Sequence, residues 1–133
     1  MAYTWTEDLN TGNETIDTQH KKWIAALNDL MAACSGGKGQ DQINATMRFL
    51  SDYTAKHFAD EENLQQKYSY PDYPNHKQMH AAFKSTMADI AKQLQTEGAT
   101  TAVVVKLSSS LGTWLINHIK TQDKKIAAHI RSK

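Results

Sequence analysis

Four stretches of this sequence repeat apolar residues in alternating steps of four and three, the spacing of a helix with one buried face. They cover residues 16–34, 43–68, 76–94 and 104–118. Each stripe is interrupted by histidine or an acidic residue where leucine or isoleucine would normally lie. These interrupting residues are His20, His57, Glu61, His76, His80 and His118, with Asp123 just beyond. The pattern predicts packed helices that carry polar groups on their inner faces.

Turn and capping signals divide the chain into four helices. The first is expected to begin near Thr15, as its N-cap, and to end at Gly36 and Gly37. The others are expected from Gln40 to about Tyr68, from Pro74 to near Gly98, and from Thr100 or Thr101 to about Lys120. Short connections favour an all-α, antiparallel up-down-up-down four-helix bundle, with residues 1–14 as an N-terminal arm and a short C-terminal helical segment. We expect one domain, residues 1–133.

The spacing between His118 and Asp123 does not fit a regular helix. Five steps of an α-helix turn the second side chain about 140° away from the first. Both can face inward only if the backbone bulges or breaks between them. The apolar stripe then resumes, rephased by one residue, at Ile126 and Ile130. We therefore expect a wider turn or a short irregular link at this point.

The interior polar groups require a partner. Burying one without a partner costs roughly 1–3 kcal/mol, so seven together would cost about as much as the whole stability of a typical domain. Imidazoles and carboxylates that converge from several helices are ligands for transition metals. Five imidazoles and two carboxylates exceed what one ion can use. The sequence therefore predicts two metal ions bridged by the carboxylates.

Composition gives no support to other classes of protein. The net charge is +1, which does not favour a nucleic-acid-binding protein. The uncharged run from Leu107 to Ile119 is too short to span a bilayer, and the first residues show no secretory signal. The single cysteine, Cys34, suits a reducing compartment. We expect a cytoplasmic protein without membrane insertion.

The same residues resemble the hemerythrin family, and most nearly its single-domain bacterial members, the bacteriohemerythrins. The motifs that carry the resemblance are Ile16-Asp17-Thr18-Gln19-His20, His57 with Glu61, His76 with His80, and Trp114-Leu115-Ile116-Asn117-His118 with Asp123. The resemblance extends over essentially the whole chain.

The resemblance implies a non-haem di-iron centre that cycles between Fe²⁺ and Fe³⁺ and takes O₂ as its ligand. One iron would be held by His76, His80 and His118. The other would be held by His20 and His57, which leaves a position open. Glu61 and Asp123 would bridge the two, beside an oxo or hydroxo group. The family's pocket-lining positions correspond to Trp23, Phe58, Trp114, Leu115 and Ile119.

The function implied is reversible dioxygen binding for storage or delivery, by a monomer that is not an enzyme, with an oxygen-consuming enzyme as one candidate acceptor. Two alternatives stay open. A di-iron oxidase or peroxidase would use mostly carboxylates and a pair of Glu-x-x-His motifs, whereas here imidazoles predominate and neither His57 nor His80 follows such a Glu. A module that senses oxygen, nitric oxide or iron would report through helix movement.

Four further polar residues are expected outside the metal site. We expect Asp60, Glu62 and His129 to face solvent. Asp17 is expected to stabilise the N-terminus of the first helix, since an acidic side chain there complements the helix dipole.

Overall fold

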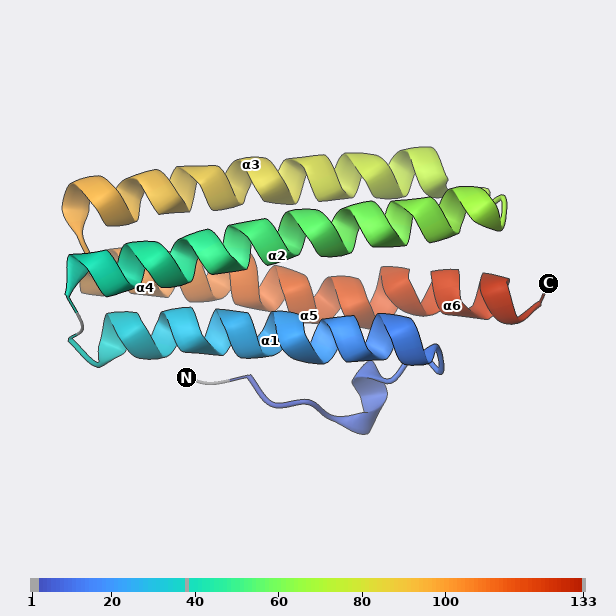
Figure 1. The fold of residues 1–133 in the computed structure, drawn as a ribbon, viewed down its shortest axis with the longest axis horizontal. Coiled ribbons are helices and arrows are strands. Elements are labelled where there is room, and N and C mark those ends of the chain that lie inside the picture. The colour runs from blue at the N-terminus through green and yellow to red at the C-terminus, as the bar shows by residue number, and fades with distance from the viewer. Residues whose placement is uncertain (1–2, 38, 133) are drawn as a thin grey trace.

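The computed structural model describes residues 3–37 and 39–132 (Figure 1). Three long helices come first: α1 (Glu14–Ser35), α2 (Gln40–Lys67) and α3 (Tyr73–Glu97). The fourth long segment is continuous but built from α4 (Thr101–Leu107), η2 (Ser108–Thr113), α5 (Trp114–His118), η3 (Ile119–Asp123) and α6 (Lys124–Arg131). Successive segments run antiparallel, with α1 against α2, α2 against α3, and α4 against both α3 and α1. The predicted all-α antiparallel bundle is confirmed.

Most helix ends follow the turn signals. The expected end of the fourth helix near Lys120 is wrong, because η3 continues that helix into α6, which ends at Arg131, and α3 begins at Tyr73, one residue before the expected Pro74. Gly98, at φ 77°, closes α3, and Gly37, at φ 68°, follows the end of α1, as expected. The predicted N-cap Thr15 is wrong. Asn13 takes that position, because its extended backbone places its side-chain oxygen to accept the Ile16 N–H at 3.1 Å.

The irregular joint predicted between His118 and Asp123 is a π-helical turn, η3. A π turn adds one residue to the helix without breaking it. His118 and Asp123 therefore both lie inside the bundle, at 5% and 0% exposed, and Ile126 continues the buried face. A second π-helical segment, η2, was not predicted.

The N-terminal arm lies against the bundle, and contacts of Tyr3 with η2 fasten it there. The Tyr3 hydroxyl donates to the Ser108 carbonyl oxygen at 3.1 Å. On α1, Asn28 bonds both Tyr3 backbone groups, accepting from its N–H at 2.8 Å and donating to its carbonyl at 2.7 Å. The Tyr3 ring lies directly on Gly112, which leaves no room for a side chain there. Trp5 is half-buried and packs against the core.

Replacing Gly112 by alanine is expected to destabilise the protein by about 1–3 kcal/mol, because the new methyl group collides with the Tyr3 ring and displaces the arm. Urea unfolding measures this loss. Gly39→Ala is the control without a steric clash, since nothing lies within 4 Å of a Cβ at that position, and it should cost less, only the difference between glycine and alanine at the N-cap of α2. Equal stability of the two variants would show that the arm is not fastened at η2.

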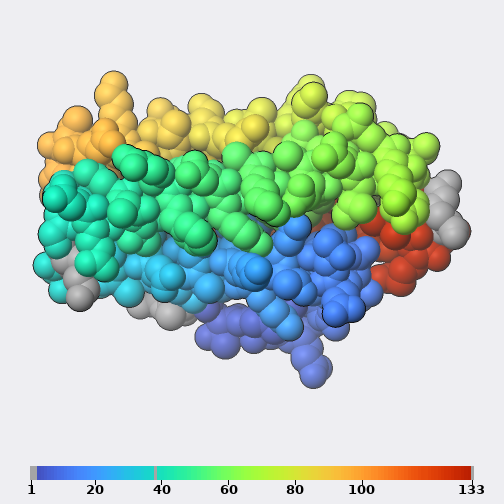
Figure 2. All heavy atoms as spheres, in the orientation of Figure 1, coloured from blue at the N-terminus to red at the C-terminus, as the bar shows by residue number. Residues whose placement is uncertain are grey.

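The buried apolar residues form two clusters on either side of a polar layer. The larger fills the bundle where the α1–α2 and α3–α4 connections lie and includes Trp23, Leu27, Ile90 and Leu107. The smaller comprises Ile16, Tyr70, Ile126 and Ala127. In Figure 2, the side chains of α1 and α2 pack closely against each other and cover one face of the bundle. Within the described residues, no helix combines the length and apolarity needed to cross a membrane.

Candidate metal centre

The polar layer brings together all seven side chains that interrupted the apolar stripes. They come from every long segment of the bundle: α1, α2, α3, and the junction of α5 with η3. Each is buried, and His118, the most exposed, is only 5% exposed. Helical periodicity makes each of these side chains point into the bundle, and the antiparallel packing of the four segments brings them to the same level.

Glu61 lies at the middle of this layer and directs one oxygen to each side. Its Oε1 is 2.9 Å from Nε2 of His76 and 3.2 Å from Nε2 of His80. Its Oε2 is 3.4 Å from Nε2 of His57 and 3.7 Å from Nε2 of His20. One carboxylate therefore contacts two separate pairs of imidazoles.

Asp123 repeats this arrangement from the fourth segment. Its Oδ1 is 3.4 Å from Nε2 of His76 and 3.3 Å from Nε2 of His118, whereas its Oδ2 is 2.8 Å from Nε2 of His20. The π turn makes this possible, because it returns Asp123 to the face that carries His118.

Two overlapping groups of potential ligands result, and both contain Glu61 and Asp123. One adds His76, His80 and His118, and the other adds His20 and His57. Within each group the ligand atoms all lie within 4.8 Å of one another. Two ligands at right angles, each about 2.1 Å from one ion, would lie about 3.0 Å apart, so these spacings suit a metal ion in each group.

The side chains present fit a pair of metal ions on independent grounds. Among the described residues, the buried side-chain atoms without a hydrogen-bond partner include Nε2 of His20, His57 and His80, Oε2 of Glu61, and both oxygens of Asp123. All of these atoms face the centre of the layer. Mixed imidazole and carboxylate donors suit iron and other first-row transition metals.

Two of the imidazoles are held in the orientation that metal binding requires. Nδ1 of His57 donates to Gln19 Oε1 at 2.6 Å, and Nδ1 of His80 donates to Glu62 Oε2 at 2.9 Å. A proton on Nδ1 leaves the Nε2 lone pair free to face a metal. The expectation that Glu62 faces solvent is therefore wrong: its side chain is only 16% exposed and lies against His80.

Asp60 is partly exposed, at 40%, yet it also supports the centre. It accepts from the Gln19 side-chain N–H at 3.0 Å and from Lys56 at 3.1 Å. Its place beside Gln19 depends on the packing of α1 against α2, which the helical phase of α2 alone does not reveal.

Two imidazoles of this cluster are strongly basic in the metal-free protein. Burial lowers the pKa of His20, but the nearby carboxylates of Asp123 and Glu61, which favour the protonated ring, outweigh it and raise that pKa to about 9. The same causes raise the pKa of His76 to about 9. Burial likewise opposes ionisation of the two carboxylates, yet the surrounding imidazoles hold the pKa of both Glu61 and Asp123 below the usual range.

A family comparison agrees with this geometry. The model of the hemerythrin HHE cation-binding domain matches residues 11–130. The chain belongs to the hemerythrin family.

Similar proteins include both bacterial and animal hemerythrins. A bacteriohemerythrin from Pseudomonas aeruginosa is 36% identical over 119 residues, which are 90% of this chain and 75% of the relative. A myohemerythrin from Sipunculus nudus is 31% identical over 123 residues, 92% of this chain and 89% of the relative. A solved crystal structure of a mutant protein is 30% identical and superposes with a TM-score of 0.81, covering 93% of this chain and 94% of that one.

Aromatic rings cover the imidazoles on the side of the larger apolar cluster. Phe58 stacks on His80 with ring centroids 3.7 Å apart, and Trp114 stacks on His118 at 4.3 Å. Trp23 lies 5.0 Å from His57, and its indole N–H donates to the Thr54 hydroxyl at 2.9 Å. The other two expected pocket residues are also buried: Leu115 is 1% exposed and Ile119 is 0% exposed.

Two other polar residues make contacts that their sequence positions did not predict. Asp17 does lie in the first turn of α1, but it is buried and accepts from the backbone N–H and the hydroxyl of Thr11, at 2.9 and 2.7 Å. It thereby fixes the turn of the arm. His129 does not simply face solvent: its Nε2 donates to the Tyr68 carbonyl at 2.7 Å, and its ring packs against Tyr70.

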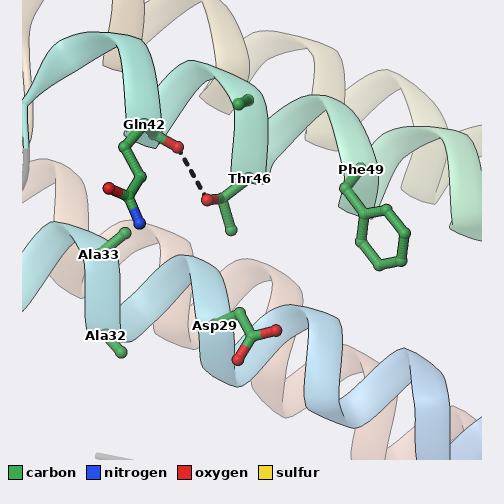
Figure 3. Close-up of a pocket in the computed structure, with 7 residues that line it drawn as sticks. Asp29, Ala32, Ala33, Gln42, Thr46 and Phe49 are labelled. Carbon is green, nitrogen blue, oxygen red and sulfur yellow. Dashed lines mark hydrogen bonds between the residues drawn. The ribbon is translucent and has the colours of Figure 1, made fainter.

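A hollow on the surface between α1 and α2 is separate from the metal centre (Figure 3). It is lined mainly by small residues such as Ala32 and Ala33, with Asp29 and the exposed ring of Phe49 at its rim. Its polar side chains include Thr46, whose hydroxyl donates to the Gln42 carbonyl at 2.7 Å. No histidine contributes to this lining, and one carboxylate alone does not make a metal site.

Proposed function

We propose that this member of the hemerythrin family holds two iron ions and binds dioxygen reversibly, in oxygen storage or delivery, and is not an enzyme. The observation that carries the proposal is the division of each carboxylate between the two imidazole groups. When bound, two ferrous ions would supply the two electrons that a reversible reaction with dioxygen requires. His76, His80 and His118 would hold one ion, His20 and His57 would hold the other, and Glu61 and Asp123 would bridge them.

The ligand set supports binding over oxidation of a substrate. Five neutral imidazoles and two carboxylates place little negative charge on the ions, whereas carboxylate-rich sites are typical of di-iron enzymes in ferritin-like bundles. The group with two imidazoles offers fewer protein ligands than the group with three. A small ligand is therefore expected to enter on the side of His20 and His57.

The surrounding residues support reversibility by excluding water. Trp23 and Phe58 are 0% and 1% exposed and cover the imidazoles from the apolar side of the layer. Protons enter a dry, low-dielectric pocket only at a high free-energy cost. The aromatic wall is therefore expected to slow proton delivery to the bound ligand and so to preserve it.

The direct test is a cycle of oxygenation on the reduced, iron-loaded protein. We expect two irons per chain and a visible absorption band that appears in air, disappears under argon, and returns over several cycles. A band that forms once and decays to a ferric protein, with an added reductant or substrate oxidised, would favour the oxidase. An iron content well below two would contradict the proposed centre.

Iron binding should release protons, because His20 and His76 must lose theirs to become ligands. With both pKa values near 9, each is protonated at pH 7, so about two protons should leave per chain loaded anaerobically with Fe²⁺. The apparent affinity should accordingly rise between pH 7 and pH 9 and level off above it. Calorimetric titration in buffers of different ionisation enthalpy measures the number. Release of no protons at pH 7 would contradict the raised pKa values of His20 and His76.

A further inference from the structure

Gln65 is a buried amide that the expected ligand set does not use. It lies on α2 one turn beyond Glu61, is 0% exposed, and has no hydrogen-bond partner for either side-chain atom among the described residues. In the sequence, the apolar residue at this point of the 43–68 stripe is the neighbouring Leu64, so periodicity did not predict that Gln65 is buried. Leaving an amide unpaired in the interior is costly, and a methionine or leucine of similar size would avoid that cost.

Two of the expected metal-binding imidazoles also lack a hydrogen-bond partner for Nδ1. A metal-binding histidine almost always donates its second ring N–H to an acceptor. Nδ1 of His57 and of His80 have such acceptors, Gln19 and Glu62. Nδ1 of His20 and of His76 are buried, and the described residues offer neither a partner.

The directions of the helices place these unpartnered groups at neighbouring levels of the bundle. In a helix each side chain leans toward the N-terminus of its own helix. α1 and α3 both begin at the end of the bundle where α2 finishes (Figure 1). His20 and His76 therefore lean toward Gln65, whereas Gln65 leans back toward Glu61 and the metal layer.

We propose that Gln65 is a positioning residue for the metal centre, and that its carboxamide oxygen binds a buried water which accepts the Nδ1–H of His20 and of His76. Water is the group that joins polar atoms lying beyond direct hydrogen-bonding reach. A buried water typically makes about three hydrogen bonds, and this water would make three: two accepted from imidazoles and one donated to Gln65. Because His20 and His76 belong to different ligand groups, the water links the two halves of the centre.

This inference rests on the proposed di-iron centre, and its test uses the full chain. Gln65→Met keeps the side-chain volume but removes the acceptor. The control is Gln66→Met, on the neighbouring exposed residue of the same helix. Fe²⁺ affinity is measured anaerobically by competition with a chelator, and the unfolding of each metal-free variant is measured in urea.

We expect Gln65→Met to weaken Fe²⁺ binding by about 10-fold or more, whereas Gln66→Met should leave the affinity unchanged. The loss of affinity in Gln65→Met should exceed any loss in the free energy of unfolding of the metal-free protein. In the iron-loaded protein, the shifted proton resonances of two imidazole N–H groups should exchange with D₂O at least tenfold faster in Gln65→Met. Equal iron affinity, or unchanged exchange of these resonances, would overturn the role of Gln65. If the wild-type chain itself failed to bind two irons, the proposed function would fail instead.

Discussion

His57→Leu is expected to reduce the iron content from two ions to about one per chain and to abolish reversible oxygenation. The group of His76, His80, His118 and the two carboxylates stays intact, whereas the other group keeps His20 as its sole imidazole. Iron analysis of the purified protein and absorption spectra in air and under argon measure the two effects.

A matched control is available at the sixth histidine. His129 lies against Tyr68 and Tyr70, away from both ligand groups, so His129→Leu should retain two irons and the oxygen-dependent absorption. If His57→Leu instead behaved like this control, the assignment of His57 to the site that admits dioxygen would be wrong.

Glu61→Gln is expected to impair both metal positions at once. The amide keeps the shape but loses the charge that faces four imidazoles, so Fe²⁺ affinity should fall on the order of 100-fold or more. The metal-free protein should also lose about 3 kcal/mol at neutral pH, because the protonated His20 and His76 lose a buried counter-charge. Chelator competition and urea unfolding measure these changes.

The pKa values give an independent check on this variant. Since Glu61 raises the pKa of His20 and His76, both values should move down from about 9 in Glu61→Gln, which NMR titration of the metal-free protein follows. Glu97→Gln, on an exposed residue of the last turn of α3, should change neither the affinity nor these pKa values. Retention of two tightly bound irons by Glu61→Gln would argue against a bridging role for the carboxylate.

Periodicity explains why so much of the fold and site could be predicted. A helical stripe shows which residues point inward regardless of what they contact, and polar residues on it are too costly to bury without a purpose. The stripes therefore placed His20, His57, Glu61, His76 and His80 on inner faces. The five-residue step from His118 to Asp123 likewise required an irregular turn, and the π-helical η3 supplies it.

Residues outside the stripes were harder to place, because their roles depend on the neighbouring helix. Glu62 is out of phase with Glu61, yet the close approach of α2 to α3 lets it accept from His80. Gln65 follows Leu64 of the stripe directly, yet the packing of α2 buries its side chain. The η2 segment had no local signal comparable to the spacing of His118 and Asp123, and the contact between Tyr3 and Gly112 joins distant parts of the chain.

The sequence by itself determined that four helices turn imidazoles and carboxylates inward, since the phase of a helix is a local property of its residues. Only the tertiary structure decided which oxygen of Glu61 and of Asp123 faces which imidazole. Those distances depend on the relative level and rotation of four helices, which are set by side-chain packing across the whole bundle.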